Sequence, residues 1–306
     1  TPSQNTVSYS TLNTDMQNLF GKSFTNRIIN GAMMIDQRNA GASLSYAASD
    51  QKYSLDRWEG MNSTDGTFTI QQSSTAPAGF VNSLLFTVTS ADSSLGTSQY
   101  AVIDQRIEGY NIADLGWGTA SASSVTISFW VRSSLTGTFG GALGNSATNR
   151  SYPFTYTISS ANTWEQKTVT IAGDTSGTWL TTNGIGIRVY FGLGAGTSVS
   201  GTAGSWAGTE YRSATGGTNV MATNGATFYI TGVQLEKGST ATSFDYRPYG
   251  TELALCQRYF EECANTGVSQ GYIINGYNHS ASQIRGVLRF AVPKRATPSI
   301  SANSTY

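Results

Sequence analysis

The side chains that most often carry catalysis or bind metals are scarce in this sequence. It contains one histidine, His279, in a polar stretch, and two cysteines, Cys256 and Cys263. A nucleophilic triad needs a buried, oriented imidazole, and a zinc site needs three or four nitrogen, sulfur or carboxylate ligands. Neither pattern is present, and no phosphate-binding or metalloprotease motif occurs. We therefore expect neither a metal nor a cofactor.

Paired carboxylates are the remaining route to an enzyme, because glycoside hydrolysis uses two of them, one on each side of the scissile bond. Asp104 with Glu108, and Glu236 with Asp245, are the candidate pairs. The chain has 18 acidic residues among 306, so such pairs arise by chance. Asp104 also lies two positions from Arg106, a natural structural partner. We expect these carboxylates to be structural and the protein not to be an enzyme.

Aromatic side chains offer a different chemistry, because their faces can stack on sugar rings. The sequence has six tryptophans. Trp58 and Trp130 fall within predicted strands and are expected in the core. Trp164, Trp206 and Tyr211 fall in predicted loops. These three are the candidate ligand-binding residues, with a host-surface glycan as the ligand.

Two short apolar stripes at helical spacing are candidates for assembly contacts. The first consists of Leu12, Met16, Leu19 and Phe20, ending at Gly21, and a helix of this length needs a neighbouring surface. The second follows Thr251, a predicted N-cap, and Glu252, in the first turn. Its apolar residues are Leu253, Cys256, Tyr259, Phe260 and Cys263.

The two cysteines of the second stripe are not expected to form a disulfide. Seven residues of helix separate their Cα atoms by ~10 Å, which exceeds the reach of a disulfide bond. A protein that assembles without disulfides can be made in a cytoplasm even when it later works outside the cell.

The overall composition excludes several classes of partner. Charged residues make up 12% of the chain, against roughly 25% in an ordinary soluble domain. Eighteen basic and 18 acidic residues give a net charge of zero, so no electrostatic surface for nucleic acid is indicated. The apolar stretches, such as 125–131, have the length of strands, and no membrane insertion is expected.

Alternating patterns and turn residues predict about ten strands and almost no helix, which favours a two-layered antiparallel sandwich. A Gly-rich stretch, 194–226, is predicted as a long surface loop. After Pro248 the pattern changes to a helix and a small β unit. The predicted strands are 26–31, 53–58, 67–70, 85–89, 100–107, 125–132, 154–158, 166–171, 186–191 and 228–235, followed by 271–274 and 284–292.

Three segments in this order resemble those of a family of bacteriophage tail-fibre and virion structural proteins. They are Asn26-Arg27-Ile28-Ile29-Asn30-Gly31-Ala32-Met33 with Asp36-Gln37-Arg38, then 229–248 with Gly232-Val233-Gln234-Leu235-Glu236 and Phe244-Asp245-Tyr246-Arg247-Pro248, and finally Cys256-Gln257-Arg258-Tyr259-Phe260. Residues 288–298 are similar to the start of the family's terminal module. The resemblance spans roughly 26–300. It implies a jelly roll similar to carbohydrate-binding modules, no catalytic residues, and a terminal module that continues beyond Tyr306.

Together these features predict an all-β jelly-roll β-sandwich with three parts. Residues 1–25 would form an N-terminal docking arm, 26–248 the sandwich, and 249–306 a helix with the start of a small C-terminal β module. The expected function is a tail-fibre or receptor-binding subunit of a virion, assembled with itself as a homotrimer and with other virion proteins. A head decoration or head fibre, a polysaccharide depolymerase, and a carbohydrate-binding module of a secreted enzyme are the alternatives.

Overall fold

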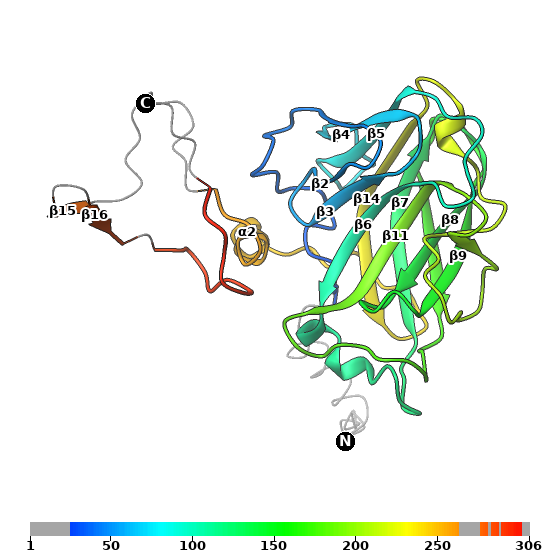
Figure 1. The fold of residues 1–306 in the computed structure, drawn as a ribbon. Helices are drawn as coiled ribbons and strands as arrows, with labels where there is room; N and C mark the ends of the chain where they lie inside the picture. Colours follow the sequence, from blue (N-terminus) through cyan, green and yellow to red (C-terminus); the bar gives the residue numbers. More distant parts are fainter. Residues whose placement is uncertain (1–24, 263–275, 281–282, 288, 302–306) are drawn as a thin grey trace, which may run out of the picture.

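Two six-stranded antiparallel sheets lie face to face and form most of the molecule (Figure 1). The computed structural model describes residues 25–262, 276–280, 283–287 and 289–301. Sheet A contains, in spatial order, β1 (Leu44–Tyr46), β4 (Thr67–Ser73), β5 (Ser83–Ser90), β14 (Thr227–Lys237), β7 (Val125–Ser133) and β10 (Glu165–Ile171). Sheet B contains β2 (Gln51–Tyr53), β3 (Trp58–Asn62), β6 (Tyr100–Glu108), β11 (Ile185–Ala195), β8 (Gly137–Gly144) and β9 (Ser151–Ile158). The predicted all-β jelly-roll β-sandwich is thus confirmed.

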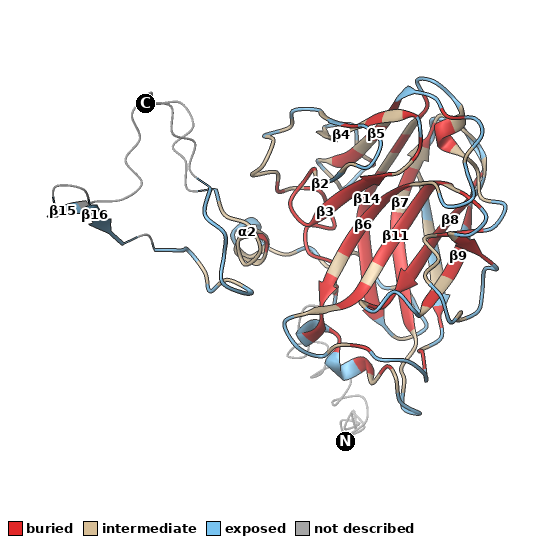
Figure 2. Cartoon of the chain, viewed as in Figure 1, coloured by how far each residue is buried: buried red, intermediate tan, exposed pale blue. Residues whose placement is uncertain are grey.

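The core lies between the inner faces of the two sheets, where buried strand residues meet (Figure 2). In β7, alternate residues from Val125 to Val131 are fully buried, as the period of a strand that covers a core requires. Phe129 of β7 meets Phe191 of β11 across the two layers, with ring centroids 5.1 Å apart. Trp58 is fully buried as expected, whereas Trp130 points outward and is half-buried.

The Gly-rich stretch after β11 is folded back over the outer face of sheet B. It contains the short strands β12 (Ser200–Gly201) and β13 (Ser213–Ala214) and the 3₁₀-helix η3 (Val220–Ala222). A Cβ atom at Gly140 or Gly192 would lie 2.4 Å from Ser213 Oγ. The glycines of β8 and β11 therefore allow this segment to lie directly on the sheet, in place of the predicted exposed loop.

Two of the predicted strands are wrong for local reasons, and a third, 284–292, forms a strand only as far as Gly286. Within the predicted strand 53–58, residues 54–57 form the turn between β2 and β3, and Arg57 has a φ of 73°, which a continuous strand cannot accommodate. Residues 26–31 form an irregular segment beside β14, joined to it by the bonds Arg27 N–Leu235 O and Val233 N–Gly31 O. We call this segment together with Thr25, that is residues 25–31, the N-terminal strap.

Beyond the sandwich, the described residues form the helix α2 (Tyr249–Gln257) and a hairpin of β15 (Gly276–Ser280) and β16 (Gln283–Gly286). The helix begins two residues before Thr251, and Pro248 occupies the N-cap position. The predicted stripe Leu12, Met16, Leu19 and Phe20, Cys263, and residues 271–274 lie outside the described residues. His279 is exposed on β15 instead of in a loop. In the described part of the chain no helix is long and apolar enough to cross a membrane.

Candidate functional site

The four carboxylates considered for glycoside hydrolysis are all engaged by other groups of the protein. Each accepts hydrogen bonds: Asp104 from Arg106, Glu108 from Arg258 and Tyr259, Glu236 from Gln234 and Thr242, and Asp245 from the backbone of Thr25 and Asn26. Each carboxylate thus has hydrogen-bond partners within the protein, and the expectation that the protein is not an enzyme stays a prediction.

Trp206 belongs to an aromatic cluster at one end of the sandwich. Its ring centroid lies 5.3 Å from that of Trp117, 5.4 Å from that of Trp179 and 5.2 Å from that of Tyr152. Its indole N–H donates to the carbonyl of Ala172 at 2.8 Å. The half-buried ring therefore packs against the core at this end.

The other two predicted glycan-binding residues lie on different parts of the sandwich. Tyr211 packs against Gly201, and its backbone N–H donates to Ser151 Oγ of β9 at 2.9 Å. Trp164, just before β10, meets Tyr229 of β14 with ring centroids 6.0 Å apart. Tyr211 thus lies against sheet B and Trp164 against sheet A. The three side chains do not form one stacking platform, and glycan binding by each of them stays a prediction.

A group of buried charges lies on the outer face of sheet B. Glu59 of β3 is directly opposite Asp104 of β6, and both form ion pairs with Arg106. Arg188 of β11 lies 3.9 Å from the same Asp104 carboxylate. Burial raises the pKa of Asp104 to about 6, in spite of the opposing effect of the two arginines. Its Oδ1 atom is buried and has no hydrogen-bond partner among the described residues.

Helix α2 docks on the sandwich of its own chain. Cys256 is fully buried and packs with Ile29 and Ile35, and burial strongly raises the pKa of its thiol. Glu252 pairs with Arg247 and accepts the backbone N–H of Asn30. The apolar stripe was expected to need a neighbouring subunit, but the N-terminal strap and the residues that follow it cover much of it. The homotrimer itself stays a prediction.

The residues that follow the helix fix the chain to the end of β6. Arg258 makes two hydrogen bonds to Glu108, of 2.6 and 2.9 Å, and the hydroxyl of Tyr259 donates to the same carboxylate at 2.5 Å. Burial acts to raise the pKa of Glu108, but these hydrogen bonds outweigh it and hold the pKa below its usual value. Burial also raises the pKa of Tyr259, to about 12.

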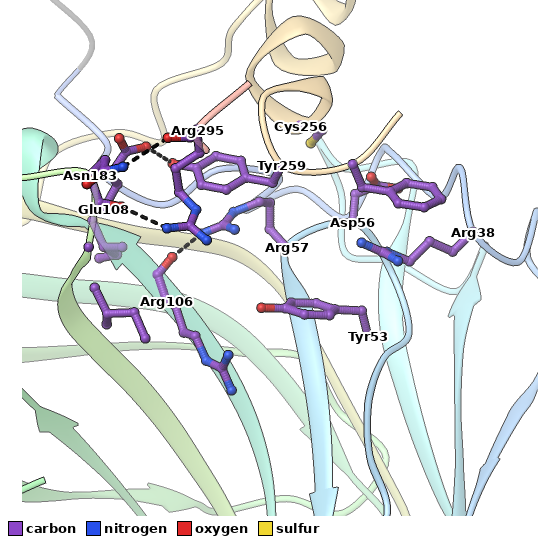
Figure 3. A pocket seen from close by; sticks show the side chains of 14 residues that line it. Arg38, Tyr53, Asp56, Arg57, Arg106, Glu108, Asn183, Cys256, Tyr259 and Arg295 are labelled. Carbon is purple, nitrogen blue, oxygen red and sulfur yellow. Dashed lines mark hydrogen bonds between the residues drawn. The ribbon is translucent and has the colours of Figure 1, made fainter. Parts of the chain in front are cut away.

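A cavity of about 210 Å³ lies where the sandwich meets the chain that follows α2 (Figure 3). In Figure 3, Tyr53 and Arg106 approach it from the sandwich, and Tyr259 approaches it from the helix side. Four arginines line it, together with two carboxylates and three aromatic rings. The charged and aromatic lining residues are Arg38, Arg57, Arg106, Arg295, Asp56, Glu108, Tyr53, Tyr259 and Phe260.

Two of these arginines are held by stacking on aromatic rings. The guanidinium carbon of Arg38 lies 3.7 Å from the ring centroid of Phe260 and 5.0 Å from that of Tyr53. The guanidinium carbon of Arg57 lies 3.6 Å from the ring centroid of Tyr259. Burial lowers the pKa of Arg38 and raises the pKa of Asp56. We call this cavity and its lining the arginine cavity, and it is the candidate functional site.

Only part of this site follows from the sequence. The helical spacing predicts assembly contacts for Tyr259 and Phe260, and Arg38 appears only within a motif of the resemblance. The signal that was missed is the aromatic pair Tyr259-Phe260 next to Arg258, since each ring receives an arginine from a distant segment. No spacing along the chain links Arg38 or Arg57 to residue 259 or 260.

Comparison with known proteins gives weak structural similarities. No family model and no curated protein matches the sequence. The enzymatically active domain of tailspike protein 4 of bacteriophage CBA120 has a TM-score of 0.37 and 10% identity, over 70% of this chain and 21% of that one. The matched region thus spans about a fifth of that tailspike chain.

Carbohydrate-binding modules are also similar. A CBM4 module has a TM-score of 0.32 and 16% identity, over 68% of this chain and 97% of that one. The family 11 module of a cellulosomal cellulase of Clostridium thermocellum has a TM-score of 0.32 and 12% identity, over 64% of this chain and 99% of that one. Similarities at this level carry no argument about function, which rests on the residues of this chain.

Proposed function

We propose that this chain is a non-enzymatic, glycan-binding structural subunit of a bacteriophage virion, and that it serves in a tail fibre. The virion role is supported by the resemblance of the strap, β14 and the segment after α2 to virion structural proteins. The non-enzymatic role is supported by the engagement of all four candidate carboxylates within the protein.

The observation that carries the glycan-binding part is an outward-facing aromatic group on sheet A. Trp164 and Tyr229 are both half-buried, and the guanidinium of Arg132 lies 5.0 Å from the Tyr229 ring centroid. Trp130 projects from the same outer face, one strand from Tyr229. Aromatic faces beside a multiple hydrogen-bond donor suit a sugar, which has apolar ring faces and polar edges.

Replacing Trp164 by alanine should weaken the binding of host-surface polysaccharide by about 1 kcal/mol, the contribution of one aromatic contact. Titration calorimetry with purified capsule or lipopolysaccharide measures this change, and the same samples should show no release of reducing ends.

Thr168→Ala is the matched control, because Thr168 is exposed on β10 and makes none of these contacts. Trp206→Ala should lower the melting temperature instead, since its ring fills the aromatic cluster. Equal affinity of the wild type and Trp164→Ala would remove the Trp164 surface from the proposal. Reducing-end release that an acid-to-amide substitution abolishes would make the protein a depolymerase.

The homotrimer belongs to the same proposal, and light scattering should give three times the mass of one chain. Support comes from exposed apolar side chains around a second cavity, of about 250 Å³, beside the start of α2. Val81, Tyr246 and Tyr249 are each more than half exposed there, and such patches mark association sites. A monomeric mass at micromolar concentration would contradict the trimer, and imaging of the particle would decide between tail and head.

A further inference from the structure

We propose that the arginine cavity is a second glycan-binding site, separate from the aromatic group on sheet A, and that it binds the carboxylate of an acidic sugar. This inference rests on the proposed glycan binding and adds the chemical class of the ligand. It starts from the charges that line the cavity and from the partners that they have.

The carboxylates in the cavity are already satisfied by other groups. Asp56 accepts hydrogen bonds from the backbone N–H of Gln37 at 2.7 Å and from its side-chain amide at 2.8 Å. Glu108 is held by Arg258 and Tyr259. Neither carboxylate forms an ion pair with Arg38, Arg57 or Arg295 within the described residues.

Three guanidinium groups of the cavity thus form no ion pair within the described residues, although the carboxylates of Asp56 and Asp36 act on Arg38, and that of Glu108 on Arg295, from a longer distance. Arg38 makes no ion pair there, and its Nε atom is buried with no hydrogen-bond partner. Arg57 donates to the carbonyl of Arg106, and its Nε atom is likewise buried and unpartnered. Arg295 donates to the carbonyl of Asn183 at 3.0 Å. Of the three, Arg57 is buried, Arg38 is half-buried and Arg295 is exposed. A buried charge without an ion pair is unfavourable, and an anion bound next to Arg57 and Arg38 would relieve this cost.

The arrangement of the arginines favours an oxyanion with several acceptor atoms. Arg38 lies over the rings of Tyr53 and Phe260, and Arg57 lies over the ring of Tyr259, so the aromatic rings restrict the positions of both guanidinium groups. A guanidinium held in this way presents its N–H donors in its own plane, where a carboxylate can accept two of them. Phosphate and sulfate share this chemistry, whereas a carboxylate on a sugar ring also brings apolar surface to the aromatic lining.

The ligand would also connect two parts of the chain. Arg38 and Arg57 belong to the sandwich, whereas Arg295 belongs to the C-terminal segment, whose backbone N–H bonds to the carbonyl of Arg258. An anion that contacts all three arginines would hold that segment against the end of β6. Binding of the sugar should therefore also protect residues 293–295 from proteolysis.

Calorimetric titration of the full chain with glucuronate, glucose and inorganic phosphate tests the proposal. We expect glucuronate to bind at least tenfold more tightly than glucose, and Arg38→Gln to weaken glucuronate binding about tenfold, the effect of losing a charge-assisted hydrogen bond. Arg295→Gln, which lies outside the sandwich, should weaken binding as well even if Arg38→Gln fails to fold. Arg285→Gln, an exposed arginine on β16, should bind like the wild type.

The experiment distinguishes failure of the acidic-sugar proposal from failure of the proposed glycan-binding function. Polysaccharide binding that is indifferent to sugar carboxylates and to both arginine variants would overturn this inference and leave glycan binding standing. Phosphate binding with no competition from glucuronate would overturn the sugar ligand in favour of a free oxyanion. No binding of any polysaccharide or sugar would overturn the proposed glycan-binding function itself.

Discussion

Replacing Gly31 by alanine should lower the free energy of unfolding by about 3 kcal/mol, the upper part of the usual range for overpacking a buried site. A Cβ atom at this position would lie 2.2 Å from the carbonyl oxygen of Val233 and 3.3 Å from a side-chain carbon of Ile28. The first contact is with backbone in a central strand, so neither partner can move without breaking the bond between Val233 N and Gly31 O. Urea denaturation measures the change.

Gly208→Ala is the matched control for this substitution. Gly208 lies in the segment over sheet B, where a Cβ atom would meet nothing within 4 Å. Its replacement should change the free energy of unfolding by less than about 0.5 kcal/mol. Equal stability of the Gly31→Ala variant and the wild type would mean that the strap does not lie against β14 as described.

Two asparagines of the strap, Asn26 and Asn30, make the hydrogen bonds that hold this irregular segment in place. Asn26 donates to the carbonyl of Val233 and accepts the N–H groups of Ile28 and Leu235. Asn30 has a φ of 59°, in the left-handed region that asparagine tolerates better than most residues, and its side chain bonds both backbone groups of Ile35. The amides thus replace the regular ladder that this segment lacks.

Replacing Asp104 by asparagine should remove a pH-dependent loss of stability. Burial raises the pKa of this carboxyl to about 6 in the folded protein, against about 3.9 in an unfolded chain. The folded state therefore binds the proton more tightly, and stability falls as the pH rises from about 4 to above 6. Two pKa units correspond to about 3 kcal/mol.

An asparagine resembles the protonated acid and cannot ionise, so the variant should gain stability relative to the wild type over this interval. The measurement is the difference in unfolding free energy between variant and wild type at pH 4.5 and pH 7.5. Asp65→Asn, at an exposed position, is the control and should keep the wild-type slope. A difference that does not grow with pH would show that the ion pairs with Arg106 and Arg188 outweigh burial.

Strands were predictable from the sequence where apolar and polar residues alternate, so that every second side chain covers the core. They were not predictable where glycines interrupt this alternation or where side-chain amides make the hydrogen bonds of a segment. Residues 125–132 alternate cleanly and form most of β7. β8 was missed because its sequence, with four glycines among eight residues, has little apolar periodicity. Those glycines are explained by the segment that packs on the sheet, which is a tertiary contact with no local signal.

The candidate site was less predictable, because its parts come from distant segments. The aromatic residues Tyr259 and Phe260 were recognised as important from their helical spacing, but their partners are arginines some 200 residues earlier in the chain. A single sequence contains no signal for such a pairing. Trp206 shows the opposite error, because a position in a Gly-rich stretch suggested exposure whereas the ring packs against the core.

The two ends of the sandwich meet at one place, which determines how it would carry a mechanical load. The backbone N–H groups of Thr25 and Asn26 bond to the Asp245 carboxylate, and Arg247 bonds to the carbonyls of Asn26 and Ile28. Tension applied between Thr25 and Arg247 would therefore act on this cluster of bonds before it acts on either sheet. A domain whose ends are joined in this way resists an applied force first through these few hydrogen bonds of Asp245 and Arg247. The strands of the two sheets remain paired until those bonds break.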